Sequence, residues 1–295
     1  MKKAKSGKIS LLPGKLNLPL RTLDFKGPAL VMAIVNCNQD SFYAPSRALR
    51  EKALEKALAA ERDGASIIDF GAESTRPGAS YISAEEELEG LIPVIEEFRK
   101  RSCLPLSVDT RKAKVARAAL DAGVDIINDI SALTDDPEMA SLCRESGAVV
   151  VLMHKKGDSK TMQLSPHYDN LVQELRDFFE KAVDRVRAAG ISPEKIILDP
   201  GFGFAKSTQN NLEIIRRLDE IFQKDYPLLV GLSRKRFIGE ICGQDKLVRA
   251  AEERLAGTLA ANGALIMAGV DIIRVHDVKE HVDLAKFLYA LMANG

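Results

Sequence analysis

The sequence has no surplus of either charge. Lysine plus arginine and aspartate plus glutamate each number 42 in the 295-residue chain. This balance argues against a general nucleic-acid binder, so an anion site must come from a local arrangement of residues. Long apolar runs are also lacking, because the basic N-terminus MKKAKSGK is not followed by a signal-like or membrane-spanning segment. We therefore expect a cytoplasmic protein that binds neither nucleic acid nor a membrane.

Cysteine is scarce and irregularly spaced. Cys37, Cys103, Cys143 and Cys242 form no CxxC pair and show no zinc-binding spacing with the four histidines. Reduced, partly buried thiols are the simplest interpretation. A GxGxxG motif is also absent after the first predicted strand, which argues against an open dinucleotide-binding sheet.

What the chain contains is a repeated alternation of apolar runs and helical stretches. Apolar runs without polar alternation suit parallel strands that are buried on both faces. The eight runs are ALVMAIVN, SIIDFGAES, PLSVDT, VDIINDIS, AVVVLMH, IILDPG, LLVGLS and VDIIRVHD. Eight such units in a chain of this length predict a single (β/α)₈ TIM barrel over residues 28–295. Residues 1–27 are predicted to form an N-terminal extension, a small hairpin over one barrel end.

The stretch IILDPGFGFAKST marks a strand that ends in a functional loop. Asp199 follows the apolar run directly, and Gly201 and Gly203 permit backbone angles and close approaches that other residues forbid. Ser207 and Thr208 are candidate N-caps of the next helix. An isolated Asp-Pro-Gly is more often only a turn, but the same layout recurs along the chain.

Polar residues end almost every predicted strand. Active sites of α/β barrels lie at the carboxyl ends of the strands, so these residues should meet at one mouth. In chain order they are Asn36, Glu73, Ser74, Thr75, Arg76, Asp109, Asn128, Asp129, Met153, His154, Asp199, Ser233, Arg234, Lys235, Arg274, His276 and Asp277. His167 and His281 lie away from these tips and are expected at the surface.

The tip residues fall into two chemical groups. The cations suit a phosphate or diphosphate, although Arg76 and Arg234 could each be surface ion pairs. Asn36 offers a neutral oxygen that could hold Mg²⁺ beside substrate phosphates. The second group suits a flat polar heterocycle, with carboxylates and an amide for its edge and apolar side chains for its faces. The cations are Arg76, Arg234, Lys235, Arg274 and His276, and the second group is Asp109, Asn128 and Asp199 with Met153 and Phe204.

Seven motifs carry a family resemblance. IVNCNQDSF, GAESTRPGA, LSVDTRK, IINDIS, ILDPGFGF, VGLSRKRFIG and IRVHDV, spanning residues 30–278, resemble dihydropteroate synthase, the folate-pathway enzyme inhibited by sulfonamides. The resemblance implies a (β/α)₈ transferase that is usually a homodimer. It also implies condensation of 6-hydroxymethyl-7,8-dihydropterin diphosphate with 4-aminobenzoate, giving 7,8-dihydropteroate and pyrophosphate.

The resemblance further implies three subsites and an Mg²⁺ cofactor. Pterin binding falls on Asp109, Asn128, Met153, Asp199, Gly203, Phe204, Lys235 and Arg274. Diphosphate binding falls on Asn36, which holds the metal, with Arg274 and His276. Aminobenzoate binding falls on Phe42, Thr75, Arg76, Pro77, Lys235 and Arg236. The catalytic roles fall on Asp109, Lys235 and Arg274.

The chain departs from the family pattern in two loops, and two alternatives stay open. The first loop has Asn38 and Gln39 in place of the usual Thr-Pro and Ala44 in place of a second Asp, and the seventh has Arg236 where many members carry Ser. One alternative is a methyltetrahydrofolate:corrinoid-type methyltransferase, which shares the barrel but not the diphosphate chemistry. The other is a non-catalytic pterin-binding paralogue with an altered first loop. The STRPG and SRK loops argue against the methyltransferase.

Overall fold

The computed structural model describes residues 15–19, 21–37, 46–73, 81–157, 167–222, 225–245 and 247–293. Its main sheet contains β3 (Leu30–Asn36), β4 (Ile67–Gly71), β5 (Leu106–Asp109), β6 (Ile126–Asp129), β7 (Val149–Met153), β8 (Ile196–Asp199), β9 (Leu229–Val230) and β10 (Ile272–Val275). These strands are parallel and lie in the order β8-β7-β6-β5-β4-β3-β10-β9. A parallel bridge between Leu198 and Leu228 joins the two ends. The predicted (β/α)₈ barrel is confirmed.

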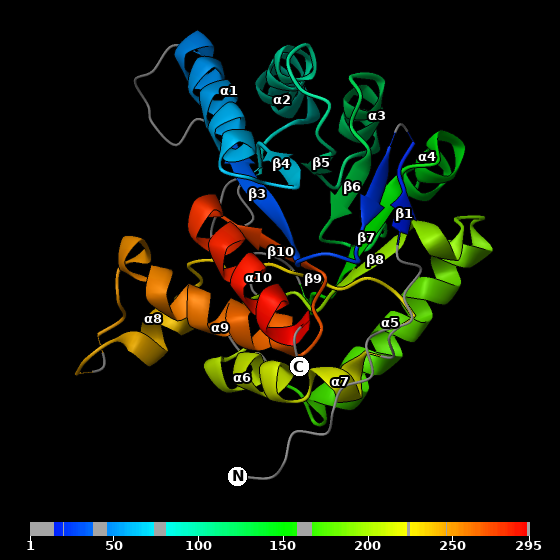
Figure 1. Ribbon diagram of the computed structural model, residues 1–295. Coiled ribbons are helices and arrows are strands. Elements are labelled where there is room, and N and C mark those ends of the chain that lie inside the picture. The colour runs from blue at the N-terminus through cyan, green and yellow to red at the C-terminus, as the bar shows by residue number, and fades with distance from the viewer. Residues whose placement is uncertain are drawn as a thin grey trace.

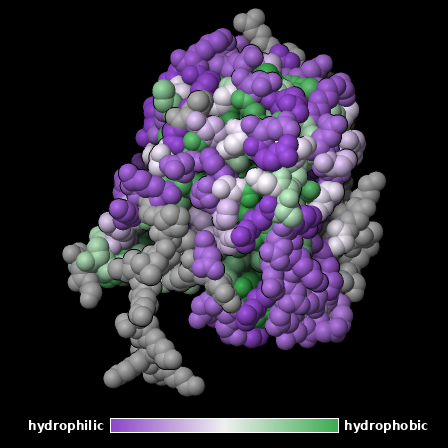
Figure 2. Space-filling view, turned by 90° about the vertical axis from the view of Figure 1, so that its right-hand side faces the viewer, coloured by the Kyte–Doolittle hydropathy of each residue, from purple (hydrophilic) through white to green (hydrophobic). Residues whose placement is uncertain are grey.

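Helices surround the barrel. They are α1 (Ser46–Arg62), α2 (Ala84–Arg99), α3 (Ala113–Asp121), α4 (Met139–Ser146), α5 (Leu171–Ala188), α6 (Thr208–Arg216), α7 (Leu218–Ile221), α8 (Arg236–Cys242), α9 (Leu255–Met267) and α10 (Val278–Ala293). The chain runs around the ring until α10 packs beside α9 and β3 (Figure 1). The side that carries α4 and α5 is mainly hydrophilic (Figure 2). In the described part of the chain, every helix is too short or too polar to cross a bilayer.

Side-chain caps explain where two of the helices begin. Ser83 accepts a hydrogen bond from the Glu86 backbone N–H, and the Glu86 carboxylate accepts one from the Ser83 N–H, which completes a capping box for α2. Ser207 caps α6 in the same way with Asn210. The expected cap of α6 is therefore Ser207, and Thr208 is the first helical residue.

Strand alternation divides the apolar core into two parts. Val31 and Phe70 belong to the layer between the sheet and the helices, whereas Met32, Ile67 and Ile272 fill the barrel interior. Because successive side chains point to opposite faces of a strand, the inward series continues toward the carboxyl ends, where it becomes polar. This alternation positions the site.

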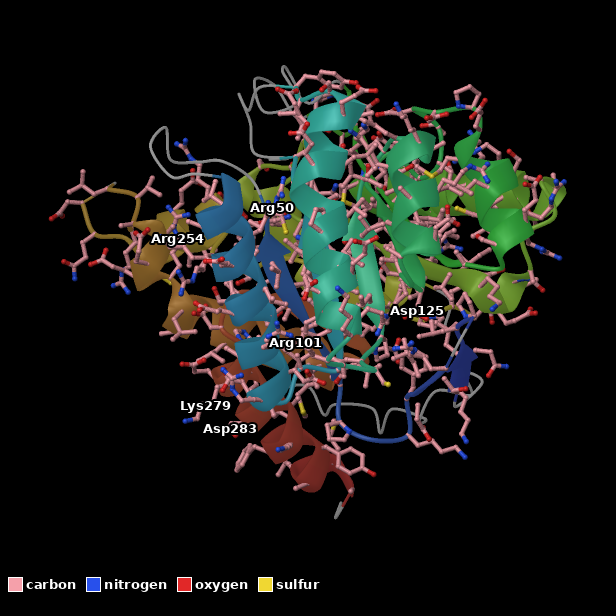
Figure 3. All side chains as sticks on the ribbon, turned by 90° about the horizontal axis from the view of Figure 1, so that it is seen from above. Arg50, Arg101, Asp125, Arg254, Lys279 and Asp283 are labelled. Carbon is pink, nitrogen blue, oxygen red and sulfur yellow. The ribbon has the colours of Figure 1, made fainter. Side chains whose placement is uncertain are left out.

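The N-terminal hairpin closes the opposite end of the barrel. Strands β1 (Lys15–Asn17) and β2 (Thr22–Asp24) pair antiparallel. Leu16 and Leu23 share one buried cluster with the interior residues near the amino ends of the barrel strands. Arg21 pairs at 3.5 Å with the buried carboxylate of Asp125, which lies beside the hairpin in Figure 3. The predicted hairpin over a barrel end is thus present, held by apolar packing and an ion pair.

Candidate active site

The inward-facing residues at the carboxyl ends of the strands meet at one mouth. Asp109 of β5 is in register with Asn128 of β6 and with Gly71 of β4. Met153 of β7 is in register with Asp199 of β8. The carboxylates and the amide that the sequence suggests for a heterocycle therefore line the same end of the barrel interior.

Arg274 of β10 connects residues from distant parts of the chain. Its Nε donates to Asp69 Oδ2 over 2.6 Å, and its Nη2 donates to Asp109 Oδ2 over 2.8 Å. Burial raises the pKa of Asp109 to about 7, with Arg274 lowering it and Asp69 raising it. The guanidinium is therefore fixed between two acids at the centre of the mouth.

Lys235 joins this cluster from the loop before α8. Its Nζ donates to the Phe202 carbonyl oxygen and lies 4.4 Å from the centre of the Phe204 ring. Burial lowers the pKa of Lys235 to about 8, although Asp199 acts in the opposite direction. Gly203 has a φ of +76°, and a Cβ there would lie 2.9 Å from the Lys235 side chain. Glycine at position 203 therefore makes room for the lysine.

Asp199 sits at the base of the glycine loop. Its Oδ1 accepts a hydrogen bond of 2.8 Å from the Gly201 N–H. Burial raises the pKa of Asp199, while the backbone N–H of Gly201 and the nearby ammonium of Lys235 lower it. Gly201 has a φ of +67°, and a Cβ at this position would lie only 2.0 Å from the His154 carbonyl oxygen. No other residue fits there without movement of the backbone.

A buried lysine behind Asp199 ties the glycine loop to the end of β7. Lys206 Nζ lies 2.9 Å from His154 Nδ1 and donates to the carbonyl oxygens of Gly201 and Phe204, each at 3.0 Å. Burial lowers the pKa of Lys206 to about 7. The ring of His154 accepts this hydrogen bond, since burial lowers the pKa of His154 to about 2 and keeps it neutral. Lys206 therefore holds the loop in one shape.

An apolar wall completes the pocket. Ile130, Met153, Phe204 and Ala205 form a buried cluster separate from the main core. Met153 and Phe204 are the two residues that the sequence assigns to the faces of a flat ring. The wall lies beside Lys235 and Asp199, so apolar and charged surfaces adjoin as a polar heterocycle requires.

Only part of the predicted cationic group carries a charge that is available to bind an anion. Arg234 Nε donates to Asp277 Oδ2 over 2.9 Å, so the ion-pair alternative for this residue is the one observed. His276 Nδ1 lies 3.0 Å from Ser233 Oγ. Burial, with the nearby cations Lys56 and Arg274, lowers the pKa of His276 to about 4. His276 is therefore neutral at pH 7, which corrects its inclusion among the cations.

The remaining predicted residues occupy the rim or lie outside the described residues. Asn36 is exposed at the end of β3, and Arg236 is 80% exposed and pairs with Glu240 at 2.7 Å. A single neutral oxygen suits Mg²⁺ when diphosphate oxygens and water supply the other ligands. Within the described ranges there is no group of three or more His, Cys, Asp or Glu arranged for a metal. Phe42, Thr75, Arg76 and Pro77, together with Asn38, Gln39 and Ala44, lie outside the described residues.

Three residues at the site are not predicted from the sequence. Asp69 lies inside the apolar run of β4, Lys206 in the glycine loop, and Asn211 on α6, where its Oδ1 accepts from the Gly203 N–H at 2.8 Å. The sequence does carry a signal for Asp69, because a charged residue within a strand buried on both faces needs a buried partner. Lys206 and Asn211 have no comparable signal in their immediate neighbourhood.

Fold and site together define a barrel enzyme that binds a polar heterocycle, and comparison with known proteins identifies the class. The family described as pterin binding enzyme matches residues 32–276. The chain is 42% identical over 280 residues to the dihydropteroate synthase of Synechocystis sp., covering 95% of this chain and 96% of the relative. It is also 42% identical to the Escherichia coli dihydropteroate synthase, covering 92% and 94%. The chain belongs to the pterin binding enzyme family, among its dihydropteroate synthases.

Solved structures agree with this assignment. The Yersinia pestis dihydropteroate synthase, solved with a sulfonamide drug complex, superposes with a TM-score of 0.88 at 39% identity, covering 95% of this chain and 99% of that one. The Xanthomonas albilineans enzyme in complex with 7,8-dihydropteroate gives 0.83 at 36% identity, with the same two coverages. These relatives favour the synthase over the methyltransferase alternative.

Proposed function

We propose that this protein condenses 6-hydroxymethyl-7,8-dihydropterin diphosphate with 4-aminobenzoate to give 7,8-dihydropteroate and pyrophosphate. The observation that carries the proposal is the cluster of Arg274 and Lys235 with the buried acids Asp109 and Asp199 beside the apolar wall. A pterin is a flat bicyclic ring system with N–H donors and ring-nitrogen acceptors along its edge. The cluster supplies complementary acceptors and donors, and the wall supplies surface for the ring.

In this proposal the pterin occupies the mouth between β5 and β8. Asp109, Asn128 and Asp199 hydrogen-bond its edge, and the Lys235 ammonium donates to a ring acceptor. Met153, Gly203 and Phe204 line its faces. Support comes from the burial of Asp109, Asn128 and Asp199, because hydrogen bonds are stronger where water is excluded.

Loss of diphosphate leaves positive charge on the pterin methylene and negative charge on the leaving group. Asp109 faces the developing cation, and Arg274, held by two acids, orients Asp109 and reaches the leaving group with His276. When bound at Asn36, Mg²⁺ would neutralise charge on the departing anion, an effect worth roughly several kcal/mol. Asp109, Lys235 and Arg274 are thus the proposed catalytic residues.

The aminobenzoate subsite follows from the family resemblance. Phe42, Thr75, Arg76 and Pro77 are assigned to it together with the backbone near Lys235 and Arg236. The arylamine attacks as a neutral nucleophile, so this subsite has to position it and exclude water rather than supply a strong base. Arg236 is a candidate partner for the aminobenzoate carboxylate once it exchanges its present partner, Glu240.

We also propose a homodimer in the cytoplasm. Several large apolar side chains on α9 and α10 are exposed, which is typical of a surface that a second copy covers. They are Met267, Phe287, Tyr289, Leu291 and Met292. Free thiols at all four cysteines fit a reducing compartment. Light scattering after size-exclusion chromatography tests the dimer, and Phe287→Glu should shift it toward the monomer.

A direct assay distinguishes the three functional hypotheses. Purified protein is mixed with the pterin diphosphate, 4-aminobenzoate and Mg²⁺, and pyrophosphate and dihydropteroate are quantified together. Equal release of both products supports the synthase. Binding of the pterin diphosphate without products would favour the non-catalytic paralogue, and methyl transfer from methyltetrahydrofolate to a corrinoid would favour the methyltransferase.

A further inference from the structure

Asp69 is a buried acid to which the family resemblance assigns no role. It lies on β4 with an exposed fraction of 0%. It is in register with Ile34 and Ser107, whereas Gly71, two residues later, is in register with Asp109. Asp69 therefore belongs to the inward-facing layer directly below the strand tips.

The Asp69 carboxylate contacts two residues of the proposed pterin pocket. Its Oδ2 accepts a hydrogen bond of 2.6 Å from Arg274 Nε and a longer one of 3.4 Å from Asn128 Nδ2. Its Oδ1 accepts none from the residues that the structure describes. We propose that Asp69 is a positioning residue that fixes the Arg274 guanidinium and the Asn128 amide for the pterin ring. This inference rests on the proposed function and deepens it.

Asp69 determines which way the Asn128 amide faces. Asn128 Nδ2 donates to Asp69 Oδ2, so the amide nitrogen of Asn128 lies toward Asp69. The amide oxygen then lies on the other side and is available as an acceptor. With this orientation the pocket selects a ring edge that presents an N–H group to Asn128, which makes Asp69 an indirect determinant of specificity.

Stability alone does not favour an acid at this position. Arg274 already pairs with Asp109, so the second carboxylate adds a buried negative charge with an oxygen that lacks a partner among the described residues. Such groups are expensive to desolvate, and well-packed apolar residues of similar size are often as stable. A role in holding the pocket accounts for the acid better than a role in holding the barrel.

Asp69 also influences the protonation of its neighbour. Burial contributes most to the raised pKa of Asp109, about 7, and the acids Asp69, Glu87 and Asp129 add to the rise while Arg274 opposes it. Replacing Asp69 by asparagine removes one like charge and leaves Arg274 to Asp109 alone. Both changes lower the pKa of Asp109.

The test compares Asp69→Asn with a matched control. Ser107→Ala changes an equally buried polar residue in the same layer, whose hydroxyl has no hydrogen-bond partner among the described residues. Calorimetry with 6-hydroxymethylpterin gives the pterin Kd, and steady-state assays give the KM of each substrate. Asp69→Asn should raise the pterin Kd about tenfold or more, typical of coupled buried networks, and leave the KM for 4-aminobenzoate within about twofold. Ser107→Ala should change neither.

Two further measurements exclude a purely structural role. Between pH 5.5 and 7.5, the inflection in pterin affinity that follows Asp109 should move to lower pH in Asp69→Asn. A double-mutant cycle with Asn128→Ala should show that the two losses do not add. Asp69→Ser serves as a second variant should asparagine unfold the protein, and circular dichroism checks both.

The outcomes separate this inference from the proposed function. If the parent protein binds pterin and turns over while Asp69→Asn behaves like Ser107→Ala, the positioning role is wrong and the function stands. The positioning role is equally wrong if the pH inflection stays in place and the losses are additive. If the parent neither binds pterin nor forms product, both proposals fail.

Discussion

Replacing Lys206 by methionine should remove a specific part of the pH dependence of stability. Lys206 is almost fully buried, and its ammonium contacts His154 Nδ1 and two carbonyl oxygens, those of Gly201 and Phe204. Methionine keeps the length of the side chain and removes the charge. The exchange leaves buried acceptors without a hydrogen-bond donor, which destabilises the fold by about 1–3 kcal/mol for each acceptor. It also removes the cost of burying the ammonium away from water. These effects oppose one another at a single pH, whereas the pH dependence isolates the charge.

The sign follows from proton binding. Burial lowers the pKa of Lys206 in the folded protein to about 7 from the ordinary 10.5, so the unfolded chain binds the proton more tightly. Stability contributed by this group therefore increases as pH rises from about 7 toward 10.5, and it is flat below about 7. With a slope approaching about 1.4 kcal/mol per pH unit, the parent should gain about 2 kcal/mol more than the variant between pH 7 and pH 9.

The assay is equilibrium urea unfolding of the parent and Lys206→Met at pH 7, 8 and 9 with reductant present. The control is Lys181→Met, which changes an exposed lysine on α5 and should run parallel to the parent. The quantity to compare is the difference in free energy of unfolding between parent and variant at each pH. If that difference stays constant across the range, Lys206 carries no shifted proton and the reasoning is wrong.

Three other predictions concern the site. Gly201→Ala should cost at least about 3 kcal/mol of stability by urea unfolding, because its Cβ would lie 2.0 Å from the His154 carbonyl oxygen. Asp109→Asn and Lys235→Ala should each lower turnover about 100-fold. The control Lys114→Ala, which changes an exposed lysine, should leave turnover unchanged. Near-normal turnover in both Asp109→Asn and Lys235→Ala would show that the proposed catalytic roles of these two residues are wrong. Chelation of Mg²⁺ should reduce pyrophosphate release by about 100-fold, and restored activity on adding Mg²⁺ is the check.

The barrel could be predicted from the sequence because parallel strands buried on both faces leave continuous apolar runs. Each of the eight runs contains a strand, and helices follow them as the predicted alternation requires. Ser207 shows why a boundary can be predicted locally, since its capping hydrogen bond involves residues only three positions away. The convergence of Asp109, Asn128 and Asp199 could also be predicted, because the carboxyl ends of the strands of a barrel meet at one mouth.

Contacts between distant segments could not be predicted in the same way. Arg274 and Asp69 lie 205 positions apart, and no local pattern specifies their pairing. His281 shows a different failure. The prediction of a surface position for it is wrong, because it is fully buried on the same face of α10 as Val278, Val282 and Ala285. Its spacing to these residues is helical, so the periodicity of α10 could have revealed the burial.

The charge state of the mouth depends on surroundings that the residue types alone do not reveal. The sequence predicts five cations there, yet Arg234 is paired with Asp277 and Arg274 lies between two acids. His276 is neutral at pH 7 because burial and neighbouring cations lower its pKa to about 4. Burial also lowers the pKa of Lys235 to about 8. With that pKa Lys235 still carries its charge at pH 7, whereas the other described members of the predicted group, Arg234, Arg274 and His276, are paired with acids or neutral. The proposed Mg²⁺ at Asn36 would therefore add to the counter-charge that Lys235 supplies for the diphosphate.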